Sequence, residues 1–323
     1  MNEPLIRVEN LKKQFPIGHW PKHDRITALD GVSLEIRPGE TLGLVGESGC
    51  GKTTLGRTIL RLTEPDSGRI FYNGEDITGR GMAPIRQKMQ MVFQDPYTSL
   101  DPMMTAGNII AEPLDIHKLC GSRQERAEKV AALLEAVGLS AGDAESYPRS
   151  FSGGQRQRIG IARALAAGPS FLVCDEPVSA LDLSIQAQIL NLLGKLQKEL
   201  RLSCLFISHD LAVVRHISDR VGVMYLGEIV EMAGTEELYS NPLHPYTKAL
   251  MSAIPSICKI GTVQTKKIIL TGEAPSPIHP PSGCKFHTRC PAAEKICALR
   301  SPPLLENGQG HFCACHKTAI RRS

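Results

Sequence analysis

The chain has 323 residues, of which 42% are hydrophobic and 22% charged, so the composition excludes a disordered chain, and the length predicts a main domain with an appendage. The net charge of +4 is too small to indicate nucleic-acid binding, and no apolar run reaches the ~18–20 residues of a membrane span. The first residues lack the apolar segment of a signal peptide, which predicts a cytosolic protein with reduced thiols.

Short strands are predicted at the beginning of the chain. Alternating apolar residues indicate strands over 5–10, 26–36 and 41–46, and again at 68–74, while a helical pattern starts at Lys52. From residue 95 to 167 the pattern changes to helix.

A strand–helix–strand pattern follows. Continuous apolar runs at 171–174 and 204–208 are typical of buried parallel strands, and an apolar helical stripe over 185–200 separates them. This order predicts a βαβ unit and therefore an α/β fold.

The composition of the tail differs from that of the preceding residues. Residues 272–303 contain seven prolines, so we expect little regular structure there. Half of the ten cysteines lie in the last forty residues, namely Cys284, Cys290, Cys297, Cys313 and Cys315.

A phosphate-binding pattern follows the strand predicted at 41–46. Gly46-Glu47-Ser48-Gly49-Cys50-Gly51-Lys52-Thr53 matches G-x-x-x-x-G-K-S/T at every fixed position. Glycines let backbone N–H groups turn onto phosphate oxygens, and the helix that follows adds its positive N-terminal end. In such a loop, Lys52 reaches the β- and γ-phosphates and the Thr53 hydroxyl ligates Mg²⁺. A glycine turn without a ligand is the alternative, and the flanking strand and helix argue against it.

Two carboxylates end the buried run at 171–174. In a protein with a phosphate-binding loop, Asp175 would hold Mg²⁺ and Glu176 would polarise the attacking water. A strand ended by solvated acids is the alternative. His209 follows the second run, and a lone histidine is more often structural than catalytic, so its role depends on the next motif.

Residues 151–155, Phe-Ser-Gly-Gly-Gln, start a helix whose free N–H groups would face an anion. A chain with both this helix start and the phosphate-binding loop resembles the ATP-binding cassette (ABC) ATPases. The resemblance covers about residues 4–255. The resemblance implies a P-loop NTPase fold with a RecA-like core, an antiparallel β subdomain and a helical signature subdomain at about 95–167. It also implies a sandwich dimer, in which the signature helix of one chain covers ATP held by the other.

The resemblance assigns roles to individual residues. Catalysis is assigned to Lys52, Glu176 and His209, and Mg²⁺ binding to Thr53, Gln94 and Asp175. Contacts with ATP are assigned to Phe15, Gly46, Glu47, Ser48, Gly49, Cys50, Gly51, Lys52, Thr53, Thr54, Gln94, Ser152, Gly153, Gly154, Gln155 and Asp182. Phe15 would stack on adenine, although a core position suits it equally. Phe151 stands where leucine is usual, at a position that makes no phosphate contact in the family.

Two tail segments narrow the family. Residues 241–250, NPLHPYTKAL, and 283–291, GCKFHTRCP, are similar to the ATPase subunits of oligopeptide and dipeptide importers, whose relatives also move nickel or glutathione. The resemblance implies a cassette at 1–255 with a C-terminal extension at 256–323.

The implied partners are a second ABC ATPase subunit (a paralogue or a second copy), two transmembrane permease subunits and a solute-binding protein, but no nucleic acid. The implied location is the cytoplasmic face of the inner membrane. Residues 95–105 would dock on the membrane partner, although an ordinary proline-broken loop fits the same letters.

In this family the tail cysteines are associated with a [4Fe–4S] cluster, which would be held by Cys284, Cys290, Cys297 and Cys315. The spacing C-x5-C-x6-C-x17-C fits neither zinc ribbons nor ferredoxins, so by itself it indicates only a soft metal with four thiolates. A cluster, zinc and metal-free thiols all stay open. Cys313 competes for the fourth place, and the family spacing favours Cys315.

Two other classes of protein explain less of the sequence. A soluble ABC ATPase of translation or DNA repair would carry a second cassette or a long insertion, and here there is one phosphate-binding loop. A P-loop kinase or GTPase leaves residues 151–155 unexplained, and the chain lacks the Asn-Lys-x-Asp motif that reads a guanine base.

Overall fold

The computed structural model describes residues 3–18, 24–79, 81–253, 268–270, 272, 275–308 and 310–319. By its internal contacts the chain divides into two compact units. The first unit comprises Met1–Leu5, Ile36–Thr41 and Tyr72–Ile207, and the second comprises Ile6–Glu35, Leu42–Phe71 and Ser208–Ser323. The domain boundary predicted at 255/256 lies outside the described residues and stays a prediction.

The first unit contains a parallel sheet. Its strands are, in spatial order, β6 (Met89–Val92), β7 (Phe171–Asp175) and β8 (Ser203–Ile207). Helix α7 (Leu183–Leu200) joins β7 to β8, which confirms the predicted strand–helix–strand unit. Both strands are buried along their whole length, as apolar parallel strands are. The register sets Asp175 opposite Ile207, at the carboxyl ends of the two strands.

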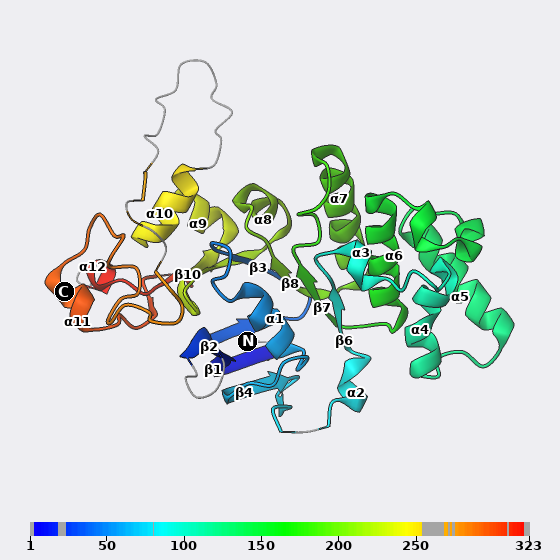
Figure 1. Cartoon of the computed structure of the whole chain (residues 1–323), viewed down its shortest axis with the longest axis horizontal. Coiled ribbons are helices and arrows are strands. Elements are labelled where there is room, and N and C mark those ends of the chain that lie inside the picture. Colours follow the sequence, from blue (N-terminus) through cyan, green and yellow to red (C-terminus); the bar gives the residue numbers. More distant parts are fainter. Residues whose placement is uncertain are drawn as a thin grey trace, which may run out of the picture. The chain divides into compact units, whose positions relative to one another are not determined.

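Helices fill the chain between β6 and β7, as predicted for residues 95–167. They are α3 (Pro96–Ser99), α4 (Ala106–Ile116), α5 (Arg123–Ala136) and α6 (Gly153–Ala166), with 3₁₀ turns at Ala141–Glu145 and Pro148–Ser150. Thr105, Ser122 and Ser152 cap α4, α5 and α6, because each side chain accepts a backbone N–H of the first turn. Figure 1 shows α4, α5 and α6 side by side, and they contact one another. The short elements β5 (Glu75–Asp76) and α2 (Ala83–Arg86) precede β6.

The second unit contains two groups of strands. One has the order β2 (Asp24–Ile36), β1 (Ile6–Ile17) and β4 (Ser67–Tyr72). In the other, β3 (Thr41–Val45) runs parallel to β9 (Arg220–Tyr225), and β10 (Glu228–Gly234) pairs antiparallel with β9. Helices α1 (Lys52–Ile59), α8 (Leu211–Ile217), α9 (Thr235–Ser240) and α10 (Pro245–Ser252) belong to this unit.

The tail extends the sheet of the second unit. Strand β12 (Phe312–Cys313) pairs with β10, and β11 (Leu305–Glu306) pairs with β12. The helices α11 (Lys295–Leu299) and α12 (His316–Ala319) are also short, with five and four residues. Among the described residues of 272–303, α11 is the one helix or strand, which fits the expectation of little regular structure there. The strands β11 and β12 and the helix α12 lie beyond that range, and the pairing of β12 with β10 was not predicted.

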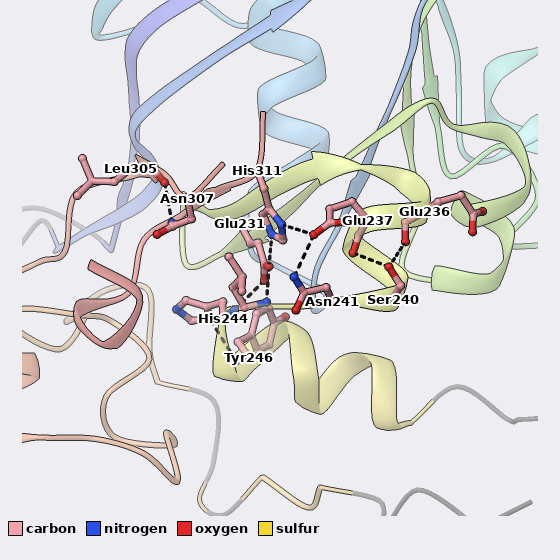
Figure 2. A network of polar contacts seen from close by, with 11 residues as sticks. Glu231, Glu236, Glu237, Ser240, Asn241, His244, Tyr246, Leu305, Asn307 and His311 are labelled. Carbon is pink, nitrogen blue, oxygen red and sulfur yellow. Dashed lines mark hydrogen bonds and ion pairs between the residues drawn. The ribbon is translucent and has the colours of Figure 1, made fainter. Parts of the chain in front are cut away.

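A buried ion pair joins the tail to β10. His311 Nε2 donates to Glu231 Oε1 at 2.7 Å, and Glu231 also accepts the backbone N–H groups of Leu243 (2.6 Å) and His244 (2.9 Å) (Figure 2). Because Glu231 is fully buried, it needs these donors to offset the loss of its hydration. The tail and the start of α10 are therefore held by one carboxylate.

No helix among the described residues has both the length and the apolar character needed to cross a membrane.

Candidate functional site

The phosphate-binding loop is shaped by glycines that no other residue could replace. Gly46 has φ 157° and Gly51 has φ 107°, and both lie in the region that favours glycine. A Cβ at Gly46 would lie 2.2 Å from the Met224 carbonyl oxygen, and one at Gly51 would lie 2.2 Å from that of Ala28. The loop between β3 and α1 therefore follows a path that needs glycine at both positions.

Lys52 lies at the first position of α1 and is 5% exposed. Its Nζ donates to the carbonyl oxygens of Gly46 (2.8 Å) and Glu47 (3.0 Å). The carbonyl oxygens do not neutralise the charge of this ammonium, and the start of the eight-residue helix adds a partial positive charge. The loop is therefore positive and suited to bind an anion. Thr53 and Thr54 follow in the first turn, and Cys50 stays a neutral thiol because burial raises its pKa.

His209 follows β8 and belongs to the same unit as the phosphate-binding loop. The Ser208 N–H donates to the Leu44 carbonyl at 3.1 Å, which ties the residue before His209 to the strand that leads into the loop. His209 is exposed, and Asp210 caps α8 by accepting the N–H groups of Ala212 and Val213. His209 therefore lies at the carboxyl end of β3, where the loop starts.

Phe15 lies on β1 and is 38% exposed, with Lys13 Nζ 5.5 Å from its ring centroid. The core alternative for Phe15 is therefore excluded, and the side chain is accessible. Its stacking on adenine stays a prediction.

In the first unit, Asp175 is the last residue of β7 and Glu176 follows it. Asp175 is 1% exposed, and Glu176 has φ 43°, a left-handed conformation that costs a non-glycine residue free energy and is common at functional sites. The Glu176 N–H donates to the Ile207 carbonyl at 3.0 Å. Gln94 Nε2 donates to Glu176 Oε2 at 3.1 Å. The structure thus brings together a predicted Mg²⁺ ligand, Gln94, and a predicted catalytic residue, Glu176, which lie 82 positions apart in the chain.

The segment at 151–155 forms a helix start as predicted. Ser152 Oγ accepts the Gln155 N–H at 3.3 Å, and Gln155 Oε1 accepts the Ser152 N–H at 2.9 Å, which is a reciprocal capping box. A Cβ at Gly154 would lie 2.5 Å from Ile185 Cγ2, so glycine allows α6 to approach α7. The Phe151 side chain is buried, so its departure from leucine affects packing. Asp182 is exposed at the start of α7.

The predicted Mg²⁺ ligands are divided between the units. Thr53 belongs to the second unit, whereas Gln94 and Asp175 belong to the first. Binding of one ion by all three stays a prediction.

The four cysteines assigned to a metal site surround one small cavity. Cys284, Cys290, Cys297 and Cys315 all line a cavity of about 20 Å³, together with His287. Burial raises the pKa of Cys284 to about 11, and neighbouring thiols add to this effect. Cys313 does not line this cavity and lies on β12, opposite Glu231. Within the described ranges, no three His, Cys, Asp or Glu side chains are close enough to hold a single metal ion.

Sequence reasoning missed two residues that contact the phosphate-binding loop. The Glu47 N–H donates to the Tyr246 hydroxyl at 2.9 Å, and the Glu47 carboxylate accepts two hydrogen bonds from Arg289. Tyr246 and Arg289 lie within the segments 241–250 and 283–291, on which the family resemblance rests. The sequence of these segments did not indicate that either residue contacts Glu47.

Two family models match the chain. The model of the ABC transporter family matches residues 29–179, and the model described as "Oligopeptide/dipeptide transporter, C-terminal region" matches residues 230–297.

Curated relatives match over almost the whole length. The oligopeptide transport ATP-binding protein AppF of Bacillus subtilis is 53% identical in an alignment of 321 positions that covers 97% of this chain and 97% of that protein. The putative oligopeptide transport ATP-binding protein YkfD of the same organism is 52% identical, over 97% of this chain and 95% of that protein.

Solved structures share the cassette. The dimeric post-hydrolysis state of the ATP-binding cassette MJ0796 bound to ADP and Pi is 30% identical with a TM-score of 0.64, and covers 71% of this chain and 98% of its own. The cbiO1 protein of Clostridium perfringens is 26% identical with the same TM-score, over 74% of this chain and 92% of its own.

Proposed function

Since the chain belongs to the ABC transporter ATPases that carry the oligopeptide/dipeptide transporter C-terminal region, we propose that it energises the import of oligopeptides or dipeptides through a membrane ABC transporter. It is an ATPase, and the peptide assignment depends on the tail. The observation that carries it is the match of residues 230–297 to that C-terminal region, which includes both the segment at 241–250 and the one at 283–291.

The phosphate-binding loop holds the triphosphate of ATP. Lys52 binds the β- and γ-phosphates, and the backbone N–H groups of residues 46–53 bind the remaining oxygens. Lys52 is prepared for this role because the carbonyls of Gly46 and Glu47 hold its ammonium inside the loop without neutralising it. Phe15 stacks on the adenine.

Glu176 takes a proton from the water that attacks the γ-phosphate. Its carboxylate is oriented by the Gln94 amide, which donates to Oε2 at 3.1 Å. His209 contacts the γ-phosphate from the end of β3. Ser152, Gly153, Gly154, Gln155 and Asp182 act on ATP held by the second cassette of a sandwich dimer.

Mg²⁺ neutralises charge on the phosphates when it is bound. Thr53, Gln94 and Asp175 would hold it, and their hydroxyl, amide and carboxylate oxygens are the ligands that Mg²⁺ prefers.

The partners follow from this role. They are a second ABC ATPase subunit (a paralogue or a second copy), two permease subunits and a separate solute-binding protein, and the chain works at the cytoplasmic face of the inner membrane. Residues 95–105 dock on the permease. They include α3, which Asp95 caps by accepting the Tyr97 N–H.

Glu176→Gln tests the ATPase mechanism. The variant keeps the shape of the side chain but loses the base, so ATP should still bind while hydrolysis falls by about 10²–10⁴. Glu199→Gln, an exposed glutamate on α7 in the same unit, is the matched control. Hydrolysis by Glu176→Gln at the unmutated rate would show that another group is the base.

Two alternative functions predict different results. An importer of nickel or glutathione keeps the ATPase and membrane partner but shows no peptide-stimulated hydrolysis. A soluble non-transport ABC ATPase does not sediment with membranes that contain the permease subunits. For the proposed function, sedimentation with membranes should require those subunits.

We also propose that Cys284, Cys290, Cys297 and Cys315 hold a [4Fe–4S] cluster. The support is that all four cysteines line one cavity, and thiolates are the ligands of such clusters. The cavity of about 20 Å³ has room for about one water, so the thiol side chains must turn outward to admit a cluster. A metal centre would also help to order this proline-rich tail, whose helices and strands are short.

Anaerobic purification tests the cluster. The protein should be brown, with broad absorbance near 400 nm and about four irons per chain. Cys290→Ser should lose iron, whereas Cys313→Ser should keep it. Colourless, iron-free protein made with iron supplied would contradict the proposal, and stoichiometric zinc would favour the zinc alternative.

A further inference from the structure

The segment between the first two tail cysteines lies against the ATPase part of the second unit. Lys285, the residue after Cys284, donates from Nζ to Asp30 Oδ2 (2.9 Å) and to the Leu226 carbonyl (2.9 Å), and it pairs with Glu228 Oε1 (3.1 Å). Its side chain is buried. These contacts attach the cysteine segment to β2 and to the turn between β9 and β10.

An aromatic cluster continues this contact. Phe286 is 1% exposed, and its ring centroid lies 5.3 Å from those of Tyr225 and Tyr246. The rings of Tyr225 and Tyr246 are themselves 4.7 Å apart. Tyr246 is therefore held between the sheet and the tail, and its hydroxyl accepts the Glu47 N–H at 2.9 Å.

Arg289, the residue before Cys290, reaches the side chain of Glu47. Its Nη1 lies 2.9 Å from one carboxylate oxygen and 3.1 Å from the other, and its side chain is 10% exposed. The carboxylate of Glu47 raises the pKa of Arg289, and Tyr225 contributes in the same direction. A charge-assisted contact in a nearly buried position is among the stronger polar interactions of a protein.

Glu47 links these contacts to Lys52. Its N–H is held by Tyr246, its carboxylate by Arg289, and its carbonyl oxygen accepts from Lys52 Nζ at 3.0 Å. A carboxylate beside a phosphate-binding loop repels ATP unless its charge is neutralised. Arg289 supplies the neutralising charge and at the same time fixes the residue whose carbonyl holds Lys52.

We propose that Arg289 is a positioning residue of the ATP site, and that through it the state of the four-cysteine site sets the affinity for ATP. Arg289 acts through Glu47, because it neutralises the Glu47 carboxylate and holds the start of the loop. Because Arg289 adjoins Cys290, a change at that cysteine moves the guanidinium relative to Glu47. The second half rests on the proposed cysteine site, whereas the first half does not.

A double-mutant cycle tests the first half. Affinity for a fluorescent, non-hydrolysable ATP analogue is measured for Arg289→Gln, Glu47→Gln, the double variant and Arg300→Gln, an exposed arginine of the same tail. Arg289→Gln should weaken binding by about threefold to tenfold, the range of a partly exposed charge pair. The double variant should bind as well as Glu47→Gln alone, because no uncompensated carboxylate is left.

The kinetic pattern separates positioning from misfolding. The KM for ATP of Arg289→Gln should rise while kcat at saturating ATP stays nearly unchanged, and Arg289→Lys should recover part of the affinity. Affinity of Arg289→Gln equal to that of Arg300→Gln would overturn the proposal. Independent losses that add up in the double variant would also overturn it.

The second half is tested by Cys290→Ser in two backgrounds. In the otherwise unmutated chain, Cys290→Ser should weaken binding of the ATP analogue about as much as Arg289→Gln does. In the Arg289→Gln background it should weaken binding no further. Equal losses in both backgrounds, or no loss in either, would overturn the link between cysteines and ATP.

Iron content of the same samples distinguishes this proposal from the cluster proposal. Protein that binds no metal, but in which Cys290→Ser weakens ATP binding only when Arg289 is present, would contradict the cluster and support the link. Protein that carries iron, but whose affinity for the analogue is the same before and after chelation, would support the cluster and overturn the link.

Discussion

The phosphate-binding loop and the tail each contain a buried lysine, and the two lysines are held differently. Lys52 is 5% exposed, and in the described part of the chain its Nζ contacts the carbonyls of Gly46 and Glu47 and the Cys50 thiol. Lys285 is 6% exposed and is paired with the carboxylates of Asp30 and Glu228. A charge held by neutral groups stays available to an anion, whereas a charge held by carboxylates is neutralised. The loop is thus built to bind a ligand, and the tail is built to hold position.

Replacing each lysine by alanine separates these roles. Lys52→Ala should lower ATP hydrolysis by about 10²–10³, because a preorganised positive charge at the phosphates is lost, and the free energy of unfolding should change little. Lys285→Ala should destabilise the tail, because Glu228 loses the ammonium at 3.1 Å and Asp30 keeps its pair with Lys12 but loses the one with the tail, and hydrolysis should fall only severalfold. Rate measurements and urea unfolding check both results, and equal loss of hydrolysis in the two variants would contradict the comparison.

The attachment of the tail should also depend on pH through His244. Burial lowers the pKa of this histidine to about 4, and its Nδ1 accepts the Tyr246 N–H at the start of α10. In the unfolded chain His244 is protonated below about pH 6.5, whereas in the folded chain it is protonated only below about pH 4. The free energy of unfolding therefore falls as the pH falls from 6.5 to 4. The loss is on the order of 3 kcal/mol.

His244→Asn is the matched test of this pH dependence, since asparagine can cap α10 without titrating. Its free energy of unfolding should change much less between pH 6.5 and 4. His311 acts in the opposite direction and at higher pH. Burial opposes its protonation, but Glu231 and Glu237 raise its pKa overall, so its stabilising effect is complete below about pH 6.5 and is lost above its raised pKa. An unchanged slope in His244→Asn would exclude His244 as the titrating group.

A glycine in the tail tests the packing around the cysteines. Gly283 has φ 66°, and a Cβ there would lie 2.4 Å from the Cys297 carbonyl oxygen. Gly283→Ala should therefore cost about 1–3 kcal/mol of local stability, measured by hydrogen exchange of tail amides. Gly310→Ala is the control, because Gly310 has φ 77° but a Cβ would meet no described atom within 4 Å. Equal losses of local stability in Gly283→Ala and Gly310→Ala would show that the loss comes from the strained backbone and not from the contact with the Cys297 carbonyl.

The sequence predicted the loop better than the tail for a physical reason. Gly46, Gly51 and Lys52 are required by the local path of the backbone and by phosphate chemistry, so their spacing is informative without any partner. Lys285 pairs with Asp30, 255 positions away in the chain, and Arg289 pairs with Glu47, 242 positions away. No local pattern carries that information, and for the same reason the pairing of β12 with β10 could not be predicted.

The predictions for the first unit follow the same rule. The strand–helix–strand unit at 171–208 was predicted from apolar periodicity, and Ser152 from its helix-start letters. The contact of Gln94 with Glu176 could be expected only from the family resemblance. The left-handed backbone of Glu176 could not be predicted from the sequence, because glycine is the residue type that indicates a positive φ and glutamate does not.

ATP-driven peptide uptake tests the central claim most directly. The chain is reconstituted with its permease subunits, second ATPase subunit and solute-binding protein in vesicles, and accumulation of a labelled oligopeptide is measured. Uptake should require ATP, should be lost with Glu176→Gln, and should persist with the Glu199→Gln control. Peptide uptake that is unaffected by Glu176→Gln, or ATP hydrolysis that the peptide and its binding protein leave unchanged, would contradict the account.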